Sequence, residues 1–124
     1  MPMADVQKTY ALVIGAVLVL VGILGFFSNP LVGDAGAGAL LGANTVENLL
    51  HIAGGALGIW LGTKGMAQAF NQWLGIVAAV IAVLGFLPAT AAMLGTWFGI
   101  NMAATVLHAV IALVSLGVAY GVKQ

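Results

Sequence analysis

The residues best suited to chemistry in this chain are two histidines, His51 and His108, and one acid, Glu47. Each histidine ends a segment that reads Gly-x-Asn, then six residues, then His, at residues 42–51 and 99–108. Two imidazoles from two helices could ligate a b-type haem, bind another metal or serve a proton path. Glu47 lies four residues before His51, which also suggests an acid–base pair on one helix face.

A structural role explains the same residues without any ligand. Asn44 and Asn101 are good helix N-caps, and Glu47 completes a capping box with Asn44. Each histidine follows its cap by seven residues, about 10 Å along the helix, where a polar side chain needs a partner. Each imidazole could bond to the other, to backbone, or to Asn48 or Thr105. We therefore expect a capping and buried polar cluster without a cofactor or metal, formed by Asn44, Glu47, Asn48, Asn101, Thr105 and the two histidines. Haem b with His51 and His108 as axial ligands is the alternative.

The elements that must position these residues are apolar helices. The chain has 124 residues, of which 63% are hydrophobic and 5% are charged, a composition typical of an integral membrane protein. Four apolar segments alternate with short connections, and Leu-Gly-Phe ends the first and the third of them. The sequence predicts an all-α, four-transmembrane-helix bundle in one domain (1–124), built from a tandem repeat of two helical hairpins, 10–62 and 70–121.

The connections between the helices and one helix-packing face are predicted from composition, a proline and the spacing of glycines. Residues 31–43 and 89–100 are expected to be interfacial loops, and residues 63–71 an aqueous loop. Pro88 should end or kink the third helix, which is predicted over 73–87. Three glycines at four-residue spacing predict a helix-packing face on the second helix: Gly54, Gly58 and Gly62.

Charge and composition exclude several functions. The formal net charge is zero, so there is no basic surface for nucleic acid. The absence of cysteine excludes thiolate metal sites and covalent haem. There is no Ser/His/Asp set or phosphate-binding glycine loop, and we expect no enzymatic activity. Lys8, Lys64 and Lys123 all fall on the side that holds both termini, which predicts cytoplasmic N- and C-termini.

The chain resembles the bacterial domain-of-unknown-function 4383 family of small four-helix membrane proteins. The matching motifs are Leu24-Gly25-Phe26 and Leu84-Gly85-Phe86-Leu87-Pro88 in the first and third helices, Asn44…Asn48-Leu49-Leu50-His51 with Gly54-Gly55 in the second, and Asn101…Leu107-His108 in the fourth. Where such proteins often carry a further His this chain has Glu47, and Ala104 and Thr105 stand where Asp and Asn are frequent. The resemblance implies the fold and a multi-pass location in the bacterial inner (plasma) membrane, but no activity.

With almost no mass outside the apolar segments, the favoured function is structural or accessory. The protein would lie in the lipid bilayer and pack with itself as a homo-oligomer or join a larger membrane complex. Haem binding for electron transfer or sensing is the alternative. A small transporter or proton path is the third hypothesis.

Overall fold

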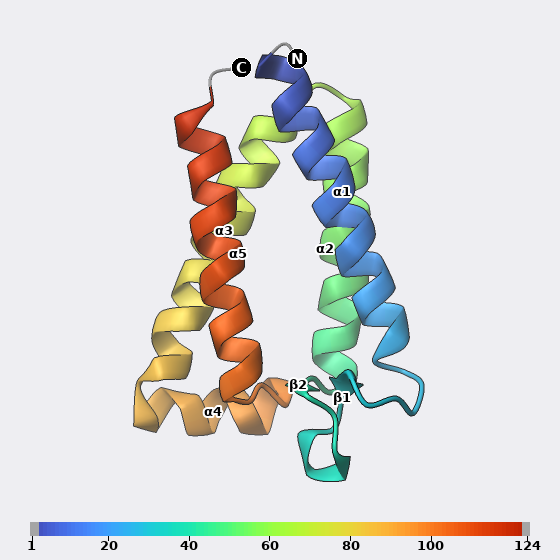
Figure 1. Cartoon of the computed structure of the whole chain (residues 1–124), viewed down its shortest axis with the longest axis vertical. Coiled ribbons are helices and arrows are strands. Elements are labelled where there is room, and N and C mark those ends of the chain that lie inside the picture. The colour runs from blue at the N-terminus through green and yellow to red at the C-terminus, as the bar shows by residue number, and fades with distance from the viewer. Residues whose placement is uncertain (1–2, 123–124) are drawn as a thin grey trace.

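The computed structural model describes residues 3–122 and is all-helical apart from one two-residue strand pair. Figure 1 shows long helices standing side by side, with α1 starting and α5 ending at the same end of the molecule. The two strands pair in parallel at the opposite end. The elements are α1 (Met3–Leu24), β1 (Val32–Gly33), a 3-10 turn (Ala35–Ala37), β2 (Leu41–Gly42), α2 (Thr45–Thr63), α3 (Ala67–Phe86), α4 (Pro88–Phe98) and α5 (Met102–Gly121). The predicted all-α class is confirmed.

Three of these helices have the length and apolar composition to cross a membrane: α1 from Asp5, α3 and α5. The helix α2 is of similar length, 19 residues, but its first two turns contain Glu47, Asn48 and His51. These polar residues lower its mean hydropathy below that of the other three.

Two connections differ from the prediction. Residues 89–100 were expected to be an interfacial loop, but 88–98 form α4. Pro88 starts this helix instead of merely ending the previous one, because a proline at the first helical position loses no hydrogen bond. The predicted aqueous loop at 63–71 is also largely helical, since α3 begins at Ala67. The first helix likewise starts earlier than residue 10.

The polar residues that suggested the aqueous loop bond to neighbouring helices. Asn71 is fully buried and donates from Nδ2 to Oε1 of Gln7 at 2.9 Å. Gln7 in turn donates from Nε2 to the carbonyl oxygens of Val118 and Val122 at 2.8 and 2.6 Å. Gln68 donates to the carbonyl of Ala119. The amides of Gln7 and Gln68 thus bond to carbonyls at the C-terminal end of α5, where the carbonyl of Val118 also accepts from the backbone N–H of Val122.

The long helices form two closely packed pairs, α1 with α2 and α3 with α5. Glycines permit the contact within each pair: a Cβ on Gly55 would collide with the backbone of α1, and one on Gly75 with Leu116 of α5. Gly58 faces Phe70, and Gly62 faces Leu12. The packing predicted for Gly54 belongs to its neighbour Gly55, because the Cβ position of Gly54 has no heavy atom within 4 Å.

The Leu-Gly-Phe motifs each make room for one polar side chain. A Cβ on Gly25 would overlap the amide of Asn48, and a Cβ on Gly85 would overlap the hydroxyl of Thr105. Asn48 and Thr105 are each only 2% exposed. Both therefore lie inside their own helix pair, where the glycine of the partner helix admits them.

Candidate functional site

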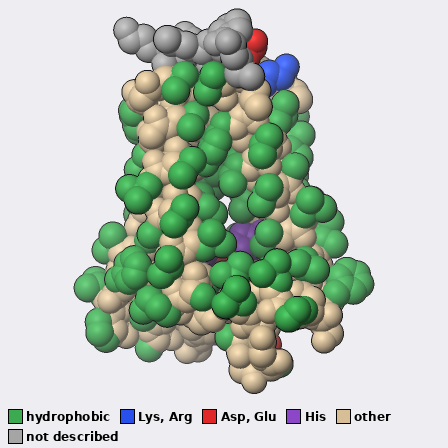
Figure 2. Space-filling model, viewed as in Figure 1, with side chains coloured by type: hydrophobic (Ala, Val, Ile, Leu, Met, Phe, Trp, Pro, Cys, Tyr) green, Lys and Arg blue, Asp and Glu red, His purple; other side chains and the backbone are tan. Residues whose placement is uncertain are grey.

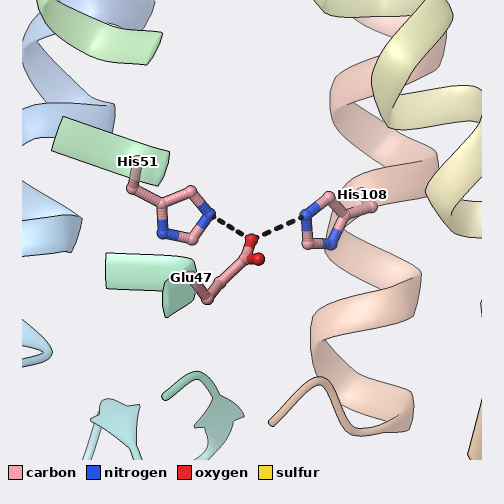
Figure 3. Close-up of side chains that lie close together, drawn as sticks. All are labelled: Glu47, His51 and His108. Atoms are coloured by element: carbon pink, nitrogen blue, oxygen red, sulfur yellow. Dashed lines mark ion pairs between the residues drawn. The ribbon is translucent and has the colours of Figure 1, made fainter. Parts of the chain in front are cut away.

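Glu47, His51 and His108 meet between the two helix pairs. Figure 3 shows the carboxylate of Glu47 between the two imidazoles, with His108 reaching it from α5. Oε1 of Glu47 lies 2.8 Å from Nε2 of His51 and 3.7 Å from Nε2 of His108. The imidazole centroids are 6.4 Å apart, with the rings inclined by 28°. One donor atom from each residue falls within 4.8 Å of the other two.

The cap of each helix sets the depth of its histidine. Asn44 accepts a hydrogen bond from the backbone N–H of Glu47, and Asn101 accepts one from that of Ala104. Their backbone angles are almost identical, with φ −106° at both and ψ of −174° and −177°. Because both caps are alike and both histidines follow by seven residues, the two imidazoles lie at the same depth and face each other.

Four hydrogen bonds tie each Gly-x-Asn segment to the other segment or to the residues just before it. The amide of Asn44 donates to the carbonyl of Trp97, and the amide of Asn101 donates to that of Leu40. The backbone N–H of Asn44 donates to Phe98, and that of Gly42 donates to Oδ1 of Asn101. Each cap is thus bonded to the connection of the other helix pair. The joined segments lie at the end of the bundle where β1, β2 and α4 gather (Figure 1), and we call them the lid.

A backbone contact orients one of the imidazoles. Nδ1 of His108 lies 2.7 Å from the carbonyl oxygen of Ala104. A carbonyl oxygen only accepts, so Nδ1 carries the proton. The neutral ring then presents the lone pair of Nε2 toward the carboxylate of Glu47. Two electron-rich atoms 3.7 Å apart in a buried site need a positive charge between them, either a proton or a metal ion.

The imidazole of His51 has a polar contact through only one of its two nitrogens. Nε2 of His51 is within hydrogen-bond distance of Glu47, whereas Nδ1 is buried and has no hydrogen-bond partner among the described residues. Oδ1 of Asn48 is also buried without a partner. The residues of the predicted polar cluster therefore lie in three separate places. Asn44 and Asn101 cap and join the segments, Asn48 and Thr105 lie within the helix pairs, and only Glu47 and the two histidines share one centre.

The centre suits a small cation better than a macrocycle. A haem held by both histidines would need its iron and ring in the gap between the imidazoles, and the Glu47 carboxylate lies in that gap (Figure 3). The residues as arranged do not fit a haem. A proton or a single metal ion needs no such clearance.

The sequence singled out all three residues but not their joint contact. Spacing alone paired Glu47 with His51, and the contact between Glu47 and His108 depends on how α2 and α5 pack. The buried amides of Gln7 and Asn71 were missed, because isolated polar residues near helix ends give no distinctive signal.

The fold and this site define a small, mostly helical chain with three helices long and apolar enough to cross a membrane and one Glu/His centre between its helix pairs. The chain matches the model of one family, described as a domain of unknown function (DUF4383), over residues 8–121. It therefore belongs to that family, as its motifs indicated. No curated protein and no solved structure matches the chain.

Proposed function

We propose that this is a membrane protein of four spanning helices that binds one divalent transition-metal ion between its two helix pairs, through Glu47, His51 and His108. The fourth span is α2. It packs along α1, which itself is apolar and long enough to cross a membrane, and its polar residues are gathered in the first two turns. The similar caps and the matched helix pairs support an origin by duplication of a hairpin.

The observation that carries the metal proposal is the convergence of three donor atoms from both pairs, with Nε2 of His108 directed at the centre. Metal–nitrogen and metal–oxygen bonds are about 2.0–2.2 Å, which places two donors of a tetrahedral site about 3.3–3.6 Å apart. The separations from Oε1 of Glu47 are 2.8 and 3.7 Å, and the three donor atoms lie within 4.8 Å of one another. Side-chain rotations that bring the widest pair closer by about 1 Å would complete such a geometry.

The surroundings of the donors support the same interpretation. A histidine that binds metal commonly donates its other N–H to a carbonyl or carboxylate, as His108 does to Ala104. Imidazole and carboxylate donors suit Zn²⁺, Co²⁺ and Ni²⁺ better than Mg²⁺ or Ca²⁺. The ion would join α2 to α5, since its ligands come from both.

Cobalt binding tests this proposal, because Co²⁺ in a site with few ligands absorbs visible light. The purified protein in dodecyl maltoside should bind one Co²⁺ per chain and release it to Zn²⁺. Binding should weaken by about 10-fold or more in Glu47→Gln, His51→Ala and His108→Ala. The control is Ser115→Ala, which removes a buried hydroxyl bonded to Tyr10 and should bind normally. Wild-type affinity in both histidine variants would refute the site.

The same spectrum tests the haem alternative. A Soret band in the protein as purified, lost in either histidine variant, would show that Glu47 moves aside for a macrocycle. A colourless protein that gains cobalt bands would support the metal ion instead.

A structural or accessory role remains the second candidate, and it is compatible with a metal centre. Large apolar side chains are exposed on each of the four long helices, among them Leu20, Leu57, Val83 and Leu113, and these face lipid or another membrane protein. We propose association with itself or a larger complex. Blue-native electrophoresis after gentle extraction tests it, and a strictly monomeric species would count against it.

Orientation in the bacterial inner membrane is part of the proposal. Lys8 near the start of α1 and Lys64 after α2 belong to the end of the bundle where α1 begins and α5 ends, and the positive-inside rule places that end in the cytoplasm. The third lysine of the prediction, Lys123, lies outside the described residues. The lid formed by the Gly-x-Asn segments would then face outward.

A further inference from the structure

The side of the bundle has an opening that leads to the histidines. Figure 2 shows a hollow between α5 and α1, framed by hydrophobic side chains, with a histidine visible inside it. The side chains of His51 and His108 are 18% and 15% exposed, whereas that of Glu47 is 6% exposed. The imidazoles are therefore the part of the centre that an outside molecule can reach.

The end of the bundle nearest the centre holds the lid, in which the two Gly-x-Asn segments are held by hydrogen bonds from Asn44, Asn101 and Gly42. A pocket of about 480 Å³ opens at this end, lined by Asn44, Asn48 and Gly99 among others, and neither Glu47 nor either histidine lines it. A Cβ on Gly42 would overlap the carbonyl oxygen of Gly99, so the two segments are in direct contact. A molecule that reaches the histidines through the hollow comes from the side, where the bilayer would lie, and not through this lid.

The proposed metal centre lacks at least one ligand, and its positive charge is not fully compensated. Three protein donors leave at least one coordination position open, as in zinc sites that bind a further ligand. A divalent ion with one carboxylate and two neutral imidazoles keeps a net charge of +1. An uncompensated charge at this depth is costly. A ligand with a single negative charge would complete both the coordination and the charge balance.

From these observations we infer that the open position takes the carboxylate of a lipid-soluble amphiphile, such as a fatty acid, whose apolar tail leaves the centre through the hollow between α1 and α5. This inference rests on the proposed metal centre. The carboxylate oxygen supplies the missing donor and the missing negative charge, and the hydrophobic frame of the hollow accommodates the tail. No bond of the amphiphile is broken in this binding.

The test uses the protein loaded with one Co²⁺ per chain in dodecyl maltoside, a detergent without charge. Dodecanoate is titrated while the visible bands of Co²⁺ are recorded. We expect a saturable shift of the bands with one dodecanoate per metal ion. Dodecan-1-ol, which has the same tail length and no charge, should leave the bands unchanged. Acetate, at the concentration that dodecanoate reaches in the micelle phase, should also leave them unchanged because the lid excludes it.

Each other outcome overturns the inference. An equal response to acetate means that the anion arrives from water, and an equal response to dodecan-1-ol means that charge does not select the ligand. Cobalt bands that respond to none of the three show that the position is already filled, in which case only this inference fails. If Co²⁺ does not bind at all, the proposed metal function fails with it.

Discussion

Two adjacent glycines in α2 should respond in opposite ways to the same substitution. Replacing Gly54 by Ala places a methyl group in open space, since nothing lies within 4 Å of that position. In a helix, Ala is more favourable than Gly by about 0.5–1 kcal/mol. Gly54→Ala should therefore raise the free energy of unfolding by about that amount.

Replacing Gly55 by Ala gains the same helix propensity but meets α1. The new Cβ would lie 2.7 Å from the backbone nitrogen of Val19 and closer still to the carbonyl oxygen of Gly15. Ordinary contact begins at 3.4 Å, so the two helices must separate by about 0.7 Å or more. Overpacking of this kind costs about 1–3 kcal/mol. The gain in helix propensity is common to both variants. The difference between their free energies of unfolding therefore measures the cost of overpacking alone.

The assay is unfolding in dodecyl maltoside micelles by added dodecyl sulfate, followed by tryptophan fluorescence. We expect Gly55→Ala to be less stable than Gly54→Ala by about 1–3 kcal/mol. A Gly55→Ala protein that is as stable as Gly54→Ala would refute the close contact between α1 and α2.

Three further predictions concern the joints between the helix pairs and the topology. Asn101→Ala removes an N-cap and the bond to Leu40, and should lower the free energy of unfolding in the same assay by about 1–3 kcal/mol. An unchanged free energy would mean that these hydrogen bonds do not stabilise the protein. Gln7→Leu removes two bonds to the end of α5 and the bond that Asn71 donates to Oε1 of Gln7. It should cost about 1–3 kcal/mol, with backbone hydrogen exchange rising at the last turn of α5. Single cysteines at positions 34 and 64 should react with an impermeant maleimide from opposite sides of the membrane, because α2 is the one long helix between them, and labelling from the same side would exclude a single crossing by α2.

Much of the architecture could be predicted because membrane helices have strong local signals. Apolar length identified the helices, and the two Asn caps marked where α2 and α5 begin. What failed were inferences from polar character alone. Asn71 was assigned to a loop because it is polar, but it bonds to Gln7 inside the bundle. α4 was missed because a short apolar segment after Pro88 has no cap or strong periodicity to distinguish helix from interfacial loop.

The centre was predicted only in part, for a geometric reason. The repeated spacing correctly indicated that His51 and His108 belong together, and the i, i+4 rule placed Glu47 beside His51. Which side chain occupies the gap between the imidazoles depends on the rotation of α2 against α5. A change of rotation by one residue would turn the carboxylate away. For the same reason, spacing could not distinguish Gly54 from Gly55 as the packing glycine.

The two Gly-x-Asn segments differ at the position of the acid, and this difference has a consequence for symmetry. Glu47 in the first Gly-x-Asn segment corresponds to Ala104 in the second. Two identical hairpins that paired as separate chains would present two carboxylates and two imidazoles, enough to surround a tetrahedral ion with four protein donors. In one polypeptide, the second segment can carry Ala104 where the first carries Glu47. In the proposed metal centre this leaves a coordination position for another molecule, which a symmetric pair of hairpins would have closed.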